Sequence, residues 1–475
     1  MKGFARVQSI EITNFKNVSY GKIDFSDYGK DNSNYQQNIT AVYGQNGSGK
    51  TALIDAIYLV QRVVLSREDI PEDIGNYIKK GADEATIAVQ FFFANSNEIS
   101  IVNYKIALRT VHNETIIVEE QVKAKECLNG AWGNLSEVIR YDSRTTPYTI
   151  SPKYLYDKLT VTTDMALDLG VAQRLSQKRG SKTSSVSSLL FSRDFRELLD
   201  KAETESRLGI ILKKIQEFCV NNLLIINDEV FGAISENQHA IPIFVKQEFR
   251  NNSSYNTAIG AIPIEIYDTT RVPSRLFYIY INFVRQINAV LPEIIPGITL
   301  KITNPVEESL PNGEKYTVFS VVTVRGEKEI SLKYESAGIK KILCVLSSLI
   351  AAFNNSDMCF IVDELDSGVF EYLLGQIVTV FKEDAKGQLI FTSHNLHILE
   401  LLDNKSIVIT RYNTDNCYGK LTNVQTNNNK RLLYLRHIEL EDEADGIIYN
   451  KTNQYEMSFA FEQAYDIFEK EDVSE

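Results

Sequence analysis

The segment GQNGSGKT follows a short run of β-branched residues, and apolar residues at spacings of three and four begin directly after it. This order of types fits GxxxxGK[ST], in which glycines let backbone N–H groups surround phosphate oxygens at the start of a helix. In such a loop Lys50 bridges the β- and γ-phosphates, and the Thr51 hydroxyl ligates Mg²⁺. An ordinary glycine turn is the alternative, and it leaves the flanking strand and helix patterns unexplained. The predicted phosphate-binding residues are Gly44, Gln45, Asn46, Gly47, Ser48, Gly49, Lys50 and Thr51.

Paired carboxylates end a second apolar run, MCFIVDELDSG at 358–368. At the tip of a strand, Asp363 is predicted to hold Mg²⁺ through water, and Glu364 to polarise an attacking water as general base. Acidic residues after a strand also cap the next helix, which is the structural alternative. The phosphate loop upstream favours the catalytic interpretation.

A histidine follows a third apolar run, QLIFTSHN at 388–395. A hydrogen-bonded structural role is the alternative for His394. However, the run is predicted to form the strand next to the one that ends at Asp363, and the carboxyl ends of parallel strands meet at one edge of a sheet. We therefore predict that His394 reaches the γ-phosphate.

Small residues open a predicted helix within YESAGIKKIL at 334–343. A helix N-terminus carries unpaired N–H donors and the positive end of the helix dipole, so Ser336 and Gly338 mark a second phosphate-ready site. The phosphate loop already uses its own helix. The second site is therefore predicted to contact nucleotide held by another subunit.

The remaining pattern predicts how these motifs are positioned. Short apolar strands alternate with helices after residue 336, which is typical of a mainly parallel α/β sheet, and strands near the N-terminus form an antiparallel sheet. Residues 1–150 and 296–475 are predicted as two parts of one head, and 151–295 as a mostly helical insertion for oligomerisation, partner docking or sensing. The expected strands are 7–13, 39–43, 86–93, 99–108, 115–118, 298–303, 316–324, 358–362, 388–392 and 406–410.

Composition indicates which partners and which cellular compartment suit the protein. The 475 residues carry a net charge of −12, which excludes a generally basic coat for nucleic acid while allowing a local basic groove. Five cysteines without a CxxC pattern favour reduced thiols. The N-terminus lacks the apolar core of a signal peptide, and the run at 342–353 is too short to span a bilayer. We expect a cytoplasmic protein with no membrane contact.

The motif order GQNGSGKT, ESAG, FIVDELDSG and FTSHN resembles the ABC-type ATPase heads of the SMC-like and OLD-like superfamily. The opening IEITNFKNV is similar to the start of those heads, and the resemblance covers about 1–65 and 295–415. It implies a head-to-head dimer around two ATP molecules. In that arrangement Ser336 and Gly338 contact the γ-phosphate in trans, Asp366 is the D-loop aspartate and His394 the switch histidine.

Two features depart from that family pattern. The signature reads ESAG instead of LSGG, which is usual for the OLD-like branch. No glutamine stands clearly in the Q-loop position, for which Gln90 and Gln121 are the candidates.

The sequence thus predicts an Mg²⁺-dependent ATPase. The resemblance extends to ATPase subunits of prokaryotic anti-phage, abortive-infection systems, and implies control of a separate effector, a nuclease or toxin, with DNA or a phage-derived molecule as trigger. A DNA-repair or chromosome-handling clamp acting directly on DNA is one alternative, and a slow ATP-bound scaffold that sequesters a toxin is another. The acidic segment at 439–445 is interpreted as a solvated helix face, and the basic segment at 174–188 as a solvated loop or a contact for nucleic acid or an acidic partner.

Overall fold

The computed structural model describes most of the chain in separate ranges. The predicted features at 439–445 and most of the basic segment, including Lys178, Arg179 and Lys182, lie outside the described residues. The described residues are 4–26, 38–66, 70, 74–95, 98–112, 114–128, 130–145, 149–177, 186–202, 207–227, 240–251, 254–412, 415–420, 430–432, 434–435 and 453–471.

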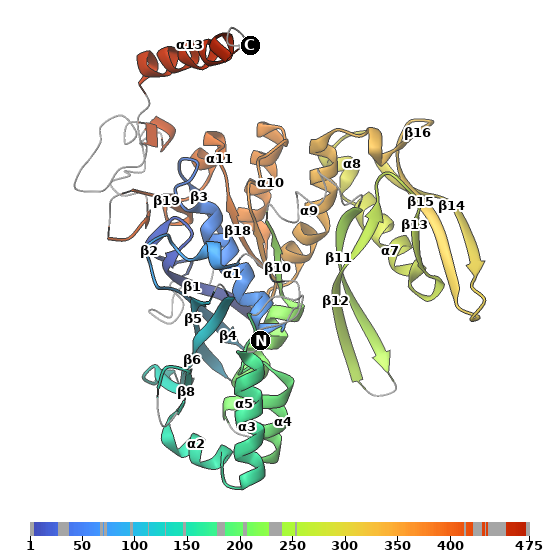
Figure 1. Cartoon of the computed structure of the whole chain (residues 1–475). Coiled ribbons are helices and arrows are strands. Elements are labelled where there is room, and N and C mark those ends of the chain that lie inside the picture. The colour runs from blue at the N-terminus through green and yellow to red at the C-terminus, as the bar shows by residue number, and fades with distance from the viewer. Residues whose placement is uncertain are drawn as a thin grey trace.

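A six-stranded, mainly parallel sheet forms the centre of the described chain (Figure 1). Its order is β10-β17-β18-β3-β19-β20, and only the edge strand β20 runs antiparallel to its neighbour. Strands from both ends of the chain meet in this sheet, as the sequence predicts. The bounds are β3 (Ile39–Tyr43), β10 (Leu223–Ile226), β17 (Cys359–Val362), β18 (Gln388–Thr392), β19 (Ile407–Thr410) and β20 (Tyr418–Lys420).

Alternate residues of the parallel strands belong to two different apolar cores. In β17, Cys359 and Ile361 pack into the core shared with the antiparallel sheet, whereas Phe360 and Val362 pack into the core under the C-terminal helices. Because successive side chains of a strand point to opposite faces, the whole strand must be apolar when both faces are covered. This explains the unbroken apolar runs that precede Asp363 and His394.

The antiparallel sheet lies beside the parallel one and has the order β2-β1-β4-β5-β6-β8-β9, with β7 paired to β6. The side-chain amide of Gln388 joins the two sheets, since it donates to the Val7 carbonyl at 2.9 Å and accepts from the Val7 N–H at 3.0 Å. The bounds are β1 (Phe4–Phe15), β2 (Val18–Asp24), β4 (Glu84–Ala94), β5 (Ile99–Val111), β6 (Glu114–Leu128), β7 (Ala131–Trp132), β8 (Ser136–Asp142) and β9 (Ile150–Ser151).

Helices cover both faces of the parallel sheet. Helix α1 packs with β1 and β4 on the face of the antiparallel sheet, while α9, α10 and α11 contribute to the core on the other face. Helix α9 has a length and composition compatible with a membrane span, but half of it is buried in the fold, as in a core helix. The bounds are α1 (Lys50–Val64), α9 (Ala337–Asn354), α10 (Glu371–Asp384) and α11 (Leu396–Leu401), with short 3₁₀ turns η1 (Ile74–Tyr77), η4 (Leu332–Tyr334) and η5 (Asn404–Ser406).

The segment 151–295 is helical in its first half. Its second half holds strands, including β10, which pairs with β17 inside the parallel sheet. Treating the whole segment as a separate domain stays a prediction. The elements are α2 (Lys153–Leu159), α3 (Thr163–Ser176), α4 (Arg193–Lys201), α5 (Arg207–Asn221), β10, β11 (Ala240–Asn251), β12 (Ser254–Glu265), β13 (Thr270–Pro273), η3 (Ser274–Leu276), α7 (Phe277–Asn288) and α8 (Leu291–Ile294).

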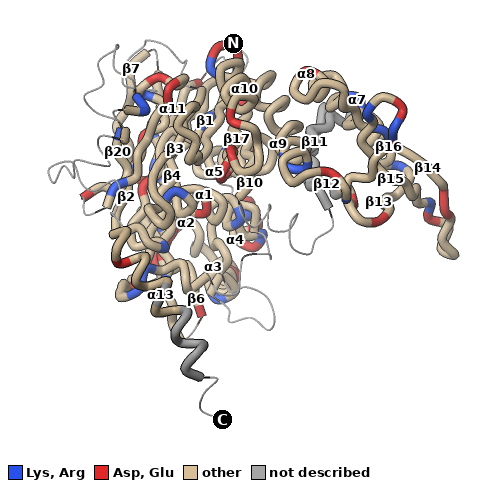
Figure 2. The backbone as a smooth tube through the Cα atoms, turned by 90° about the horizontal axis from the view of Figure 1, so that it is seen from above, with Lys and Arg blue, Asp and Glu red and all other residues tan. Residues whose placement is uncertain are grey.

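A smaller antiparallel sheet projects to one side of the parallel sheet (Figure 1). It contains a hairpin of β14 (Thr299–Ser309) and β15 (Lys315–Arg325), where strands 298–303 and 316–324 are expected, together with β13 and β16 (Lys328–Ser331). The last described helix is α13 (Gln454–Glu471). Acidic and basic residues are interspersed along the described chain (Figure 2), in keeping with 50 basic and 62 acidic residues in the whole sequence.

Candidate nucleotide site

The phosphate loop connects β3 to α1, as the motif predicts. Gly47 and Gly49 adopt φ values of 76° and 106°, a region that residues with a Cβ rarely enter. Gly44, with φ of 156°, also lacks room for a side chain, because a Cβ there would lie 1.7 Å from the Thr410 hydroxyl oxygen. Backbone conformation therefore favours glycine at all three positions, and at Gly44 the lack of space adds a second reason.

Lys50 is buried at the first position of α1. Its Nζ donates to the carbonyls of Gly44 at 2.8 Å and Gln45 at 3.0 Å, so the ammonium group is folded over the loop. Burial lowers the pKa of Lys50, while the charges of Asp363 and Glu364 oppose that shift. The structure thus brings the predicted lysine and the predicted carboxylates into one electrostatic environment.

Asp363 follows β17 and is fully buried. Its Oδ1 accepts hydrogen bonds from the Thr392 hydroxyl of β18 and, at 3.2 Å, from the Glu364 N–H. Its Oδ2 is buried without a hydrogen-bond partner among the described residues. A buried carboxylate oxygen with unused lone pairs suits a hard cation or its water ligands.

The residues present are compatible with Mg²⁺, and Asp363 and Thr51 stay its predicted protein contacts. Thr51 is half-buried in the first turn of α1. Within the described chain, no group of three or more His, Cys, Asp or Glu side chains could enclose a metal. Such a sparse set is typical of Mg²⁺, which keeps several waters and takes other ligands from substrate phosphates.

Glu364 occupies a conformation that non-glycine residues seldom adopt, with φ of 45°. Two contacts hold it there: its N–H donates to the Thr392 hydroxyl at 2.7 Å, and its carbonyl accepts from the Lys341 ammonium. Strained backbone of this kind is concentrated at functional sites. The turn leaves the Glu364 side chain half-buried, which suits a group that must meet water.

Asp366 and His394 are joined directly, since the His394 N–H donates to Asp366 Oδ2 at 2.9 Å. The other oxygen of Asp366 is buried and has no hydrogen-bond partner among the described residues. Partial burial and the nearby Lys50 cation lower the pKa of His394 from its ordinary value of 6.5. The imidazole is therefore neutral at pH 7 and can both donate and accept a hydrogen bond.

Ser336 caps the N-terminus of α9, where its hydroxyl accepts from the Ile339 N–H at 3.3 Å. Its side chain is otherwise exposed. Gly338 lies against the turn after Asp366, because a Cβ there would stand 2.1 Å from the Gly368 carbonyl oxygen. Gly338 of the predicted signature thus contacts the predicted D-loop segment of its own chain, and Ser336 is exposed.

Sequence reasoning missed several side chains that hold this site. Thr392 lies inside the quoted FTSHN motif, but nothing in the local pattern shows that it bonds Asp363. Asn227, directly after β10, donates to Asp55 of α1 at 3.1 Å, and Asp55 also pairs with Lys16. These contacts join segments far apart in sequence, so no spacing signal announces them.

The two candidate Q-loop glutamines make contacts within the antiparallel sheet. Gln90 accepts from the Ser9 hydroxyl at 3.1 Å, and Gln121 donates to Glu137 at 2.6 Å. Neither bond connects a glutamine to the phosphate loop or to the carboxylates.

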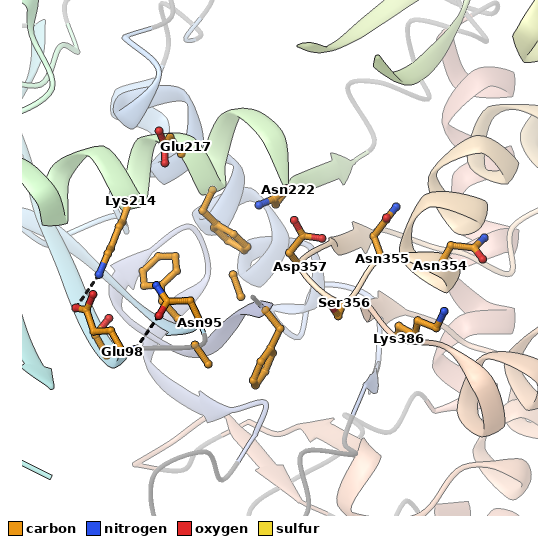
Figure 3. A pocket seen from close by; sticks show the side chains of 16 residues that line it. Asn95, Glu98, Lys214, Glu217, Asn222, Asn354, Asn355, Ser356, Asp357 and Lys386 are labelled. Atoms are coloured by element: carbon orange, nitrogen blue, oxygen red, sulfur yellow. Dashed lines mark hydrogen bonds and ion pairs between the residues drawn. The ribbon is translucent and has the colours of Figure 1, made fainter. Parts of the chain in front are cut away.

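A cavity of about 610 Å³ lies at the other end of the parallel sheet (Figure 3). Asn354, Asn355, Ser356 and Asp357 line it and precede β17, whereas Asp363 follows that strand. The ion pair between Lys214 and Glu98 crosses its wall at 2.8 Å. This cavity is separate from the candidate site.

A phosphate loop after β3, a buried carboxylate after β17 and an antiparallel sheet beside the parallel one define the class of the protein. The fold is that of an ABC-type P-loop ATPase head. A family model described as the RecF/RecN/SMC N terminal domain matches residues 6–416, and the chain belongs to this family of SMC-like ATPases.

Individual relatives are distant. The DNA replication and repair protein RecF of Shewanella woodyi is 28% identical over 121 residues, which cover 23% of this chain and 30% of that relative. Thus, the chain spans under a third of the length of the curated relative it matches.

Solved structures with a similar arrangement also have low identity. The Smc head bound to the C-winged helix domain of ScpA is 12% identical with a TM-score of 0.42, and the alignment covers 87% of this chain and 96% of that one. The SMC head domain from Thermotoga maritima is 14% identical with a TM-score of 0.36, covering 88% and 100%. RecF with ATP is 13% identical with a TM-score of 0.34, covering 82% and 93%.

Proposed function

We propose that the protein hydrolyses ATP to ADP and phosphate with Mg²⁺ as cofactor. The observation that carries the proposal is the fully buried Asp363 with one unpartnered oxygen, in the same electrostatic environment as Lys50 of a complete phosphate loop. Charge on the transferred phosphoryl group is then met by Lys50 and by the N-terminus of α1. Mg²⁺, when bound, supplies the remaining neutralisation of phosphate charge.

Glu364 is proposed as the general base. Water attacks the γ-phosphorus, its proton passes to the Glu364 carboxylate, and the bond between the γ-phosphorus and the β–γ bridging oxygen breaks to release ADP. The neutral imidazole of His394, whose backbone N–H is bonded to Asp366, is proposed to hydrogen-bond the γ-phosphate.

The site is proposed to be completed by a second copy of the chain. Ser336 stands outward at the start of α9, and three aromatic side chains around it and the D-loop are unusually exposed. Tyr334 is 74% exposed, Phe370 73% and Tyr372 61%. Large exposed aromatics are enriched at protein interfaces, which supports a head-to-head dimer that covers them.

For the biological process, we infer DNA handling in the cytoplasm. The family membership and the RecF relative support this inference. We expect DNA to raise the ATPase rate and binding to weaken with salt. No response to DNA at low salt contradicts this inference and leaves the ATPase proposal intact.

A second candidate is control of a separate nuclease or toxin in anti-phage defence. The ESAG signature, usual in the OLD-like branch, favours it. Co-expression with the products of neighbouring genes, followed by mass measurement with and without ATP, tests this candidate. A stable complex whose effector is released or activated by ATP turnover supports it, and slow turnover in the complex favours the scaffold variant. Absence of any complex contradicts it.

The ATPase proposal is tested by replacing Lys50. Lys50→Ala should lower turnover by at least about 100-fold, because the phosphate charge loses its buried cation. Lys386→Ala is the matched control, since Lys386 is an exposed lysine beside the cavity in Figure 3. Phosphate release by purified wild type and both variants is the measurement. Equal rates in wild type and Lys50→Ala overturn the proposal.

A further inference from the structure

Three hydroxyl groups from the edge of the parallel sheet donate hydrogen bonds to backbone carbonyls of the phosphate loop or of the residue directly before it. Thr410, the last residue of β19, donates to the Tyr43 carbonyl at 3.1 Å. Tyr412 donates to the Asn46 carbonyl at 3.2 Å, and Tyr418 of β20 donates to the Gly49 carbonyl at 2.8 Å. Tyr43 is the last residue of β3, directly before the loop, whereas Asn46 and Gly49 lie within the loop.

The strand pairing explains why these groups reach the loop together. Strand β19 runs parallel to β3, with Val408 opposite Val42, so its end lies beside the point where the loop begins. Thr410 and Tyr418 are directly opposite in the antiparallel β19–β20 pair, which places their side chains on the same face. The hydroxyl triad therefore comes from one hairpin.

The fit between hairpin and loop is close. Thr410 is fully buried against Gly44, where any Cβ would meet its hydroxyl, and Tyr418 is buried beneath Gly21, where a Cβ would lie 2.4 Å from the tyrosine ring. Burial raises the pKa of Tyr418 well above its ordinary value, so its hydroxyl stays protonated and can donate at every working pH. The hairpin has little freedom to move away without losing these contacts.

Peptide planarity gives these bonds a consequence for ligand binding. A carbonyl and the N–H of the next residue belong to one rigid plane and point in opposite directions. Holding the carbonyls of Tyr43, Asn46 and Gly49 on the hairpin side thus directs the N–H groups of Gly44, Gly47 and Lys50 away from it. Backbone N–H groups aimed to one side of a loop form an anion-binding concavity.

We propose that Thr410, Tyr412 and Tyr418 are positioning residues that preset the loop N–H groups for a nucleoside triphosphate and so determine nucleotide affinity. They act through backbone carbonyls at the loop and, for Thr410, also through a hydrogen bond with the Ser48 hydroxyl of the loop. None of the three touches the reacting atoms. The inference builds on the proposed ATPase function and adds a part of the chain that no recognised nucleotide motif includes. It also connects the segment after β19 to nucleotide binding.

The test removes each hydroxyl while keeping the side-chain volume. Tyr418→Phe and Thr410→Val should each raise the KM and the Kd for ATP about 3- to 10-fold, the effect of one lost hydrogen bond. Tyr412→Phe should give a smaller rise, because this side chain is only half-buried. At saturating ATP, kcat should stay within about twofold of wild type, since a bound triphosphate reorganises the loop.

The controls separate positioning from a general structural role. Tyr141→Phe removes a buried hydroxyl that accepts from Gln177 at 2.8 Å in the antiparallel sheet, and should leave the ATP Kd unchanged. Thr410→Ser keeps the donor and should restore affinity lost in Thr410→Val. If Thr410→Val does not fold, Tyr418→Phe and Thr410→Ser still decide the question.

ATP binding by the wild type and by the variants tests the proposed ATPase function and the positioning role separately. Wild-type protein that binds no ATP overturns the proposed function. Wild-type protein that binds ATP, together with Tyr418→Phe and Thr410→Val of equal affinity, overturns the positioning role alone. A fall in kcat without a change in KM also overturns it, because the hydroxyls would then act on the chemical step.

Discussion

Among the described residues, the carboxylates of Glu120 in the antiparallel sheet and of Asp363, directly after a strand of the parallel sheet, are both fully buried, but they differ in their hydrogen-bond partners. Glu120 of β6 accepts from the Leu189 N–H at 2.6 Å on one oxygen, and from Tyr104 at 2.8 Å and Ser188 at 2.6 Å on the other. Asp363 of the parallel sheet shares the same burial but leaves Oδ2 without a partner among the described residues. Both oxygens of Glu120 accept hydrogen bonds from the protein, whereas Oδ2 of Asp363 is available to a cation or to water.

The comparison shows how a buried carboxylate that stabilises the fold differs from one that is available for metal binding and catalysis. Glu120 joins the antiparallel sheet to the segment before α4, and its three donors offset much of the cost of burying it. Asp363 contributes much less to the free energy of unfolding, since its Oδ2 gains no hydrogen bond from the described residues when the chain folds. We therefore expect opposite responses to mutation: Asp363 should matter for turnover and Glu120 for stability.

The sharpest test of this contrast is Asp363→Asn. Losing the negative oxygen should lower Mg²⁺-dependent turnover roughly 100- to 1,000-fold, since a metal contact is worth several kcal/mol in the transition state. The melting temperature should stay equal or rise, because an incompletely paired buried charge disappears. Phosphate release and thermal unfolding of the same preparation measure both. Unchanged turnover, or a large fall in melting temperature, breaks the comparison.

Glu364→Gln sharpens the comparison within the same site. Without a general base, turnover should fall about 100-fold while ATP remains bound. The bound state should accumulate as the closed dimer, which a mass measurement with ATP detects. Glu371→Gln, at the start of α10, is a matched control for loss of one carboxylate nearby. A Glu364→Gln variant as active as wild type would falsify the base role.

Glu120→Ala probes the other carboxylate. The change leaves three donors without their acceptor and opens a small cavity, so the free energy of unfolding should fall by about 2–4 kcal/mol. ATP affinity should remain that of wild type. Urea unfolding gives the first quantity and nucleotide titration the second. Loss of ATP binding in a folded Glu120→Ala variant would show that Glu120 also serves the site.

The smallest expected effect is a pH dependence. Burial raises the pKa of Glu120 above its ordinary value of 4.5, so ionisation costs more in the folded than in the unfolded state. Its contribution to stability is then greatest below pH 4.5 and is lost as pH rises through the folded pKa. Glu120→Gln does not titrate, and the Tyr104 and Ser188 hydroxyls can reverse to accept from its amide. Urea unfolding from pH 5 to 7 should therefore show a smaller decrease of the free energy of unfolding with pH in the variant than in wild type. Equal pH dependence of the two free energies excludes the effect.

The local motifs were readable from sequence because their chemistry is contiguous. The phosphate loop, its flanking strand and helix, the runs that precede Asp363 and His394, and the strands expected at 298–303 and 316–324 all appear in the structure where the patterns predict them. Each combines a periodicity with a residue type that only one local structure accommodates.

Long-range contacts were not readable in the same way. Strand β10 has four residues after a helix, and only its pairing with β17 makes it a strand of the parallel sheet. Thr392 and Tyr418 become important through partners 29 and 369 positions away, respectively. A single sequence carries no signal for such pairs, so the supporting contacts of the site emerge only from the folded chain.

The contact between Gly338 and the Gly368 carbonyl has a mechanical consequence. With no side chain between them, the first turn of α9 cannot approach the D-loop further without pushing its backbone. Asp366 stands two residues before Gly368 and is bonded to the backbone of His394. A force applied at Ser336 by a neighbouring molecule would therefore reach the histidine through main chain over a short path.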